Sequence, residues 1–144
     1  MRVIAIYNDE GVSSRSCHAI YREANALYGS QFNVQYVDRH FVMAGKFSDL
    51  ALFIMPGGRA KPYHTQLAGR AEANLRNYVL TGGRYLGLCA GAYYASRYTE
   101  FAVGHSMEIT TQGELDFFRG YAIGPAYGID SFAYNSPQGA QLVQ

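Results

Sequence analysis

A short apolar run that ends in a cysteine between two glycines most constrains the fold of this 144-residue chain. The run, residues 84–88, leads into Gly87-Leu88-Cys89-Ala90-Gly91, and small and aromatic residues follow at once. This pattern is typical of a buried strand that turns sharply into a helix, because glycines permit a tight turn with strained dihedral angles. It predicts a nucleophile elbow that holds the Cys89 thiol near the amino end of a helix, where unpaired N–H groups favour the thiolate. The alternative is a small apolar cysteine where strand and helix merely pack closely.

Apolar runs alternate with helix-like segments over residues 1–96. The runs have the composition of parallel strands, and the segments have apolar residues at three- and four-residue spacing, which is typical of amphipathic helices. The strands are expected at residues 2–7, 32–38, 50–55 and 84–88, and the helices at residues 14–28 and 66–81. This order predicts an α/β fold with an open, mainly parallel sheet, in which residues 32–38 lie towards an edge. Residues 39–49 are assigned no element, and the C-terminal third is expected to be rich in hairpins and loops.

Composition and charge narrow the classes of protein to which the chain can belong. Hydrophobic residues make up 49% and charged residues 16%, which is typical of a single globular domain over residues 1–144. The formal net charge of +1, without a basic run, argues against nucleic acid or an anionic membrane as a partner. No apolar run approaches the roughly 20 residues that span a bilayer, so we expect a cytoplasmic protein. Cys17 and Cys89 lie too far apart to indicate a disulfide framework or a metal site, and no cofactor is indicated. Helical spacing places Cys17 and Leu27 on the core side of the helix at 14–28.

Three polar or glycine-rich segments follow predicted strands. Asp9-Glu10 follows the first strand, Pro56-Gly57-Gly58-Arg59 follows the third, and Cys89 follows the fourth. Because the carboxyl ends of parallel strands meet at one rim of the sheet, where ligands bind, we expect these segments to lie together. This convergence favours the nucleophile elbow over the merely packed cysteine.

Cysteine chemistry at such a rim needs further groups. The N–H of Ala90 is one candidate oxyanion donor, and the backbone of Gly57-Gly58 is expected to supply the second. Glu10 is a candidate to bind the thiol or take a proton, and Arg59 is a candidate to bind a carboxylate or another anion. The alternatives are an ordinary tight turn at Gly57-Gly58, a solvated loop carboxylate at Glu10 and an exposed surface cation at Arg59.

The base is harder to find among the four histidines. His18 falls within the first predicted helix and His40 in an unassigned connection. His64 follows the Gly57-Gly58 turn, and His105 lies in a loop sixteen residues after Cys89. His64 and His105 are therefore the candidates to serve the cysteine as catalytic residues.

Many of these residues, taken in order, resemble the class I glutamine amidotransferase-like superfamily, and within it the domain at the amino end of biotin-protein ligases. The resemblance implies a flavodoxin-like three-layer α/β sandwich with the cysteine at its elbow, and a ligand pocket lined by the residues around it, Gly91 and Tyr93 included. It rests on Tyr7-Asn8, Pro56-Gly57-Gly58, Pro62-Tyr63, Gly87-Leu88-Cys89-Ala90-Gly91-Ala92-Tyr93, Glu100-Phe101, Met107-Glu108, Phe117-Phe118, Gly124-Pro125-Ala126-Tyr127 and Tyr134-Asn135-Ser136.

The chain departs from this superfamily in two ways. Active amidotransferases carry a glutamine four residues after the cysteine, where this chain has Tyr93. They also carry a histidine and a glutamate near their carboxyl end, and no such segment precedes Gln144. The resemblance therefore implies degenerate glutamine hydrolysis and a chain that lacks the C-terminal strands of the full family. The glycine- and arginine-rich adenylate loop of a biotin ligase is also absent, so the chain is not itself a ligase.

Three functions stay open at this point. The favoured one is a binding or regulatory module whose Cys89 pocket holds a small polar molecule or a partner. The second is a cysteine-dependent amidase or acyl-transfer enzyme with Cys89 as nucleophile, and the third is a redox-sensitive thiol. Missing strands would expose a sheet edge or an apolar face, which predicts a homo-oligomer.

Overall fold

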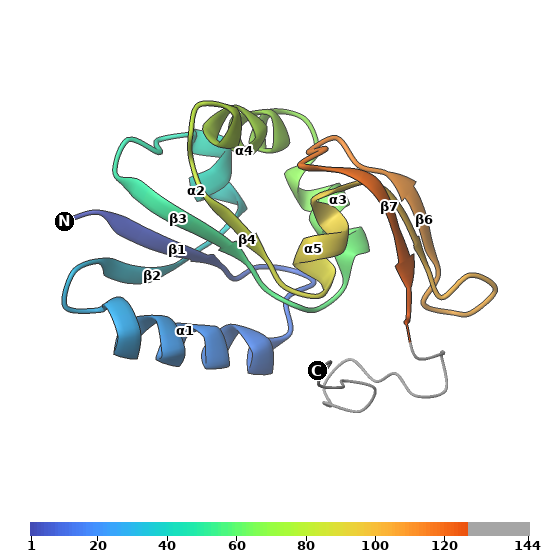
Figure 1. Cartoon of the computed structure of the whole chain (residues 1–144), viewed down its shortest axis with the longest axis horizontal. Helices are drawn as coiled ribbons and strands as arrows, with labels where there is room; N and C mark the ends of the chain where they lie inside the picture. The colour runs from blue at the N-terminus through green and yellow to red at the C-terminus, as the bar shows by residue number, and fades with distance from the viewer. Residues whose placement is uncertain (127–144) are drawn as a thin grey trace.

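The computed structural model of the protein describes residues 1–126, and their strands form two sheets (Figure 1). The first sheet contains β1 (Val3–Tyr7), β2 (Asn33–Val37), β3 (Leu50–Met55) and β4 (Tyr85–Gly87). All its pairings are parallel, in the order β2-β1-β3-β4. The second sheet contains β5 (Ser96–Phe101), β6 (Ile109–Gln112) and β7 (Phe118–Gly124), in the order β6-β5-β7. The predicted parallel α/β sheet is thereby confirmed, with β2 at an edge.

Helices cover both faces of the first sheet (Figure 1). The helix α1 (Ser14–Tyr28) lies on one face, and α2 (Arg39–Ala44) and α4 (Arg70–Leu80) lie on the other. Two shorter helices, α3 (Ala60–Leu67) and α5 (Ala90–Tyr94), lie between α4 and the second sheet. Helix α1 begins after Ser13, whose Oγ accepts a hydrogen bond from the Ser16 N–H at 3.4 Å. The arrangement is the expected three-layer sandwich.

Alternate residues of the central strands fill two separate cores. On the α1 face, Ile4, Ile6 and Ile54 pack with Cys17 and Ala24. Cys17 is 1% exposed, as its helical spacing predicts, and burial raises the pKa of its thiol to about 11. On the opposite face the cluster is larger and rich in aromatic rings; it includes Tyr7, Phe53, Met55, Tyr63, Leu75 and Tyr94.

The prediction of a single helix at residues 66–81 is wrong. The structure has two helices there, α3 and α4, and α3 begins six residues earlier than the prediction, at Ala60. Pro62 lies in the first turn of α3, where a missing N–H breaks no helical hydrogen bond. Gly69, with a φ of +78°, separates the two helices because few other residues adopt that conformation. The unassigned residues 39–49 contain α2, which Asp38 caps through its carboxylate.

The second sheet follows the C-terminal prediction in part. A hairpin joins β5 and β6, which pair antiparallel, but β7 pairs parallel to β5. Its outer face exposes large apolar side chains, of which Tyr121 is 72% and Ile123 is 68% exposed. Tyr127 and residues 134–136, which contribute to the family resemblance, lie outside the described part of the chain.

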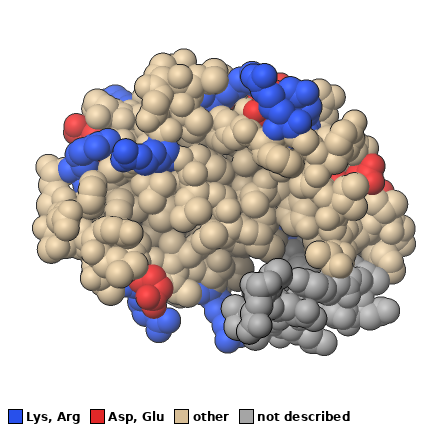
Figure 2. Space-filling model, viewed as in Figure 1, with Lys and Arg blue, Asp and Glu red and all other residues tan. Residues whose placement is uncertain are grey.

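Two surface properties bear on the expected partners. Within residues 1–126, no helix combines the length and hydropathy that a membrane-spanning segment requires. On the face drawn in Figure 2, Lys and Arg side chains form small separate groups among uncharged residues. That face therefore carries no continuous basic surface.

Candidate functional site

Cys89 lies at a sharp turn between β4 and α5. We call residues 87–91 the Cys89 turn. Cys89 precedes the first residue of α5 and has a φ of +51°, a conformation that non-glycine residues rarely adopt. Backbone hydrogen bonds fix the turn on both sides, from the Leu88 N–H to the Met55 carbonyl at 3.0 Å and from the Gly91 N–H to the Leu88 carbonyl at 2.9 Å. The side chain of Cys89 is exposed, so its thiol is accessible from solvent.

The two glycines of the turn are needed for close packing. A Cβ at Gly91 would overlap the Met55 carbonyl oxygen, and a Cβ at Gly87 would overlap the Gly91 carbonyl. Strand β3, strand β4 and helix α5 can therefore approach this closely only without side chains at both positions. Tyr85 adds a further hold on α5, because its hydroxyl donates to the Gly91 carbonyl at 2.7 Å.

The Gly57-Gly58 segment lies directly beside Cys89. A Cβ at Gly57 would be 3.4 Å from the Cys89 Cβ. The Gly57 N–H donates to the Ser16 Oγ at 3.2 Å and is therefore already engaged. Gly58 has a φ of +150°, and a Cβ there would overlap the backbone of Gly11. Tyr63 holds the segment from behind, since its buried hydroxyl donates to the Pro56 carbonyl at 3.1 Å, with the Gly57 carbonyl at 3.3 Å.

Among the backbone N–H groups near the thiol, those of Gly58 and Ala90 have no acceptor among residues 1–126. The hydrogen bonds of the Cys89 turn use the N–H groups of Leu88 and Gly91 instead. Gly58 and Ala90 line a small cavity together with Cys89. Both groups are therefore placed where oxyanion donors were expected, although their roles stay predictions.

Side chains of the second sheet close this small cavity. Its volume is about 20 Å³, which is room for about one water molecule. Tyr93 packs its ring edge-to-face against Phe101, with centroids 5.3 Å apart, and burial raises the pKa of its hydroxyl. The Thr99 hydroxyl donates to the Tyr93 carbonyl at 3.0 Å. The cavity lining consists of Gly58, Ala60, Cys89, Ala90, Tyr93, Thr99, Phe101 and Ile109.

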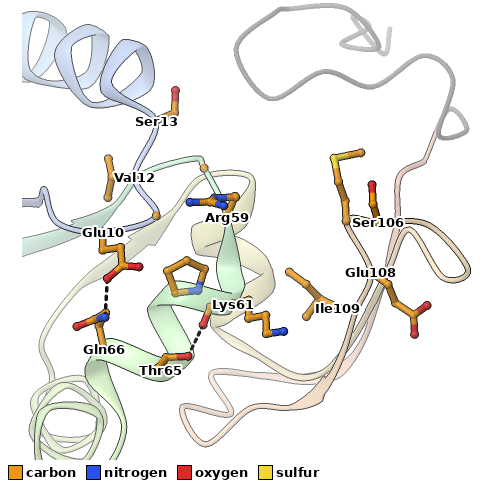
Figure 3. A pocket seen from close by; sticks show the side chains of 14 residues that line it. Glu10, Val12, Ser13, Arg59, Lys61, Thr65, Gln66, Ser106, Glu108 and Ile109 are labelled. Atoms are coloured by element: carbon orange, nitrogen blue, oxygen red, sulfur yellow. Dashed lines mark hydrogen bonds between the residues drawn. The ribbon is translucent and has the colours of Figure 1, made fainter.

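A much larger cleft adjoins this cavity and shares Gly58 and Ile109 with it. The cleft has a volume of about 780 Å³ and lies between α3 and the segment that enters β6 (Figure 3). Glu10 lies on one side, where its carboxylate accepts a hydrogen bond from the Gln66 amide at 2.7 Å. Arg59 and Lys61 line the cleft from the start of α3.

Neither candidate histidine lines the Cys89 cavity or the cleft. The His64 ring instead packs on Tyr94, with centroids 4.8 Å apart. Its Nε2 is buried without a hydrogen-bond partner in the described structure, and burial lowers the pKa of the ring. His105 is exposed in the loop between β5 and β6. The structure therefore brings Cys89, Gly58, Ala90 and Tyr93 together, and it leaves both histidines elsewhere.

A buried carboxyl group lies behind the cavity, close to Tyr94. Glu72 of α4 is 6% exposed. Burial raises the pKa of its carboxyl group, and the Tyr94 hydroxyl opposes that shift. Glu114 contributes to the increase through its negative charge.

Sequence reasoning missed several residues around the site. Ser16 and Tyr63 hold the Gly57-Gly58 segment, and Lys61 joins Arg59 in the cleft. The sequence did contain a signal for Tyr63, because Pro62-Tyr63 is one of the segments on which the family resemblance rests. Ser16 gave none, because a serine in the first turn of a helix is common. Thr99 and Phe101 were also missed. They close the cavity through tertiary contacts of the second sheet, and the sequence pattern predicted only hairpins and loops in that part of the chain.

Comparison with known proteins gives related sequences and a related fold. The family model described as "Biotin-protein ligase, N terminal" matches residues 1–144. A protein of Chlamydia muridarum (strain MoPn / Nigg), described as "Uncharacterized protein", is 35% identical over 142 residues, covering 96% of this chain and 54% of that protein. A biotin–protein ligase of Schizosaccharomyces pombe is 29% identical over 140 residues, covering 96% of this chain and 22% of the ligase. The chain thus spans about half or less of the curated relatives that it matches.

A solved structure shares the fold. The crystal structure of a glutamine amidotransferase superposes with a TM-score of 0.59 at 18% sequence identity, covering 88% of this chain and 59% of that one. At this identity the likeness concerns the fold alone. It agrees with the parallel sheet and flanking helices described above.

Proposed function

The chain belongs to the family of biotin-protein ligase N-terminal domains, and from that premise we propose that it is a binding domain without hydrolytic activity. The domain holds a small polar molecule in the cleft beside the Cys89 turn. It keeps the fold of a glutamine amidotransferase, as its structural neighbour has, but uses the site for binding.

The proposal is carried by the contrast between the two hollows that meet at Gly58 and Ile109. The cleft, at about 780 Å³, has the size of a typical site for a small molecule. The cavity beside Cys89, at about 20 Å³, is too small to enclose a substrate amide, although the thiol itself is exposed. Tyr93 occupies the position that follows the cysteine by four residues, and no histidine of residues 1–126 lines either hollow. A thiol without a nearby histidine base and without a pocket that encloses the acyl group is poorly equipped for turnover.

A second candidate, a cysteine-dependent amidase, is favoured by one observation. Cys89 is exposed at a positive φ, and the Gly58 and Ala90 N–H groups near it lack acceptors in the described structure. These are the parts of an acyl-transfer site that do not depend on a histidine. The amidase requires that Tyr93 moves and that a proton acceptor other than His64 or His105 reaches the thiol.

One experiment separates the two functions. The wild-type protein and the Cys89→Ala variant are mixed with L-glutamine, other small amides, amino acids and organic acids, and both Tm and ammonia release are recorded. A bound ligand at one hundred times its Kd stabilises the folded state by about 2.7 kcal/mol, which raises Tm by several degrees. We expect the same increase in both proteins and no ammonia. Ammonia release that disappears in Cys89→Ala would establish the amidase instead.

A further inference from the structure

We propose that the cleft of Figure 3 binds an organic anion, whose charged group is held by Arg59 and Lys61. This inference rests on the proposed binding function and names the chemical class of the ligand. It concerns the cleft and does not require a reaction at Cys89.

The two cations that line the cleft form no ion pair with the described residues. No carboxylate of residues 1–126 lies within 4.0 Å of the Arg59 guanidinium or the Lys61 ammonium. The two acidic residues of the cleft accept hydrogen bonds from uncharged groups. Glu10 accepts from the Gln66 amide at 2.7 Å, and Glu108 accepts from the Gly104 N–H at 2.7 Å. Figure 3 shows the Glu108 carboxylate directed away from the cleft. Arg59 and Lys61 therefore have no carboxylate within ion-pair distance among residues 1–126, while Glu10 keeps its negative charge on another side of the cleft.

The backbone fixes the positions from which the two cationic side chains extend. The Arg59 N–H donates to the Gly11 carbonyl at 2.8 Å, which ties the residue to the loop after β1. Lys61 is the second residue of α3, so its stem leaves from a regular helix. In Figure 3 the Lys61 side chain extends toward the side of the cleft formed by Ile109. A guanidinium and an ammonium that line the same cleft can each give charge-assisted hydrogen bonds to a carboxylate or phosphate group.

The rest of the lining favours an organic molecule over a bare inorganic ion. Val12, in the loop between β1 and α1, and Pro62 of α3 line the cleft, and Met107 and Ile109 line it on the side of β6. Apolar surface of this kind gains free energy by covering carbon atoms, whereas a small ion would leave it in water. The volume of about 780 Å³ also exceeds what a single phosphate or carboxylate group would fill. Organic carboxylates and phosphate esters both carry the required negative charge, and the experiment distinguishes them.

The test is isothermal titration calorimetry of the whole 144-residue chain with four probes. Citrate supplies carboxylates, glycerol 3-phosphate supplies a phosphate ester, inorganic phosphate lacks an organic body, and triethyl citrate lacks charge. Each is titrated into the wild type and into Arg59→Gln and Lys61→Gln. The chain has one other lysine, so Lys46→Gln is the matched control for Lys61→Gln, and Arg22→Gln on the surface of α1 is the control for Arg59→Gln.

We expect citrate or glycerol 3-phosphate to bind, and each cleft variant to weaken that binding about tenfold. The control variants should bind as the wild type does, and added salt should weaken binding in the wild type. Whichever organic anion binds more tightly identifies carboxylate or phosphate as the recognised group. Unchanged affinity in both cleft variants, equal binding of triethyl citrate or of inorganic phosphate, or no binding of either organic anion would overturn the proposal. None of these results depends on ammonia release, so the two proposals fail separately.

Discussion

The two sheets of this protein make different contributions to the site. The first sheet is buried between helices, and its strand ends fix the backbone of Gly57, Gly58 and Cys89. The second sheet is covered on one side only, and it contributes the side chains of Thr99, Phe101 and Ile109 that close the cavity. The first sheet therefore determines where the backbone around the Cys89 thiol lies, and the second determines how large the cavity beside that thiol is. The following substitutions test this division, from the largest expected effect to the smallest.

Phe53 in β3 and Ile123 in β7 give the sharpest contrast in stability. Phe53 is 0% exposed and Ile123 is 68% exposed. Phe53→Ala should lower the free energy of unfolding by about 3 to 5 kcal/mol, because it leaves a cavity between packed rings. Ile123→Ala should change it by less than about 0.5 kcal/mol. Urea denaturation followed by circular dichroism measures both. Comparable losses in the two variants would mean that the outer face of the second sheet is covered in solution, as in the expected homo-oligomer.

Gly91 and Gly104 compare a crowded glycine with an open one. A Cβ at Gly91 would overlap the Met55 carbonyl, whereas Gly104, with a φ of +83°, has no atom within 4 Å of its Cβ position. Gly91→Ala should cost about 3 kcal/mol or more, because backbone must move to admit the methyl group. Gly104→Ala should cost about 1 kcal/mol from its left-handed conformation alone. Both are read from the same urea curves. A Gly91→Ala protein as stable as Gly104→Ala would show that β3 and α5 are not in close contact.

Two carboxyl groups, one beside each sheet, should respond to pH in opposite ways. Burial raises the pKa of Glu72 above its ordinary value of 4.5, and Arg97 lowers that of Asp116 below 3.8. Ionisation of Glu72 is harder in the folded state, so its stabilising contribution is lost as pH rises through the raised pKa. The contribution of Asp116 is present at higher pH and is lost as pH falls through the lowered pKa.

Glu72→Gln should therefore raise Tm by a few degrees at pH 7 and leave it unchanged near pH 3. Asp116→Asn should lower Tm slightly at pH 7 and have no effect at very low pH, since the exposed Arg97–Asp116 pair contributes little. Thermal unfolding between pH 3 and pH 8 measures both effects. A Glu72→Gln variant with the same pH profile as the wild type would contradict the assigned burial effect.

The sequence predicted the first sheet well, because parallel strands that are buried on both faces are continuous apolar runs, and such runs are easy to recognise. The strand Leu50–Met55 and the helix Ser14–Tyr28 were placed with the bounds that the structure shows. Leu27 is the exception within that helix. Its spacing assigns it to the core, yet it is 65% exposed.

The second sheet was predicted less well for a physical reason. Its strands alternate polar and apolar residues only in part, and the parallel pairing of β5 with β7 joins strands that are separated in sequence by β6. The same limit applies to the site. Glycines and the cysteine carry local signals, so their meeting at one rim was predictable. The orientation of His64 toward Tyr94 was not, because it follows from the packing of α3 against α5.

The strand order has a consequence for how the chain folds during synthesis. Strand β1 is made first but lies inside its sheet, between β2 and β3. Its second neighbour, β3, is complete only when Met55 has been added, and translation at about 5 to 20 residues per second makes this a delay of several seconds. During that interval the residues Ile4 and Ile6 cannot reach their final burial.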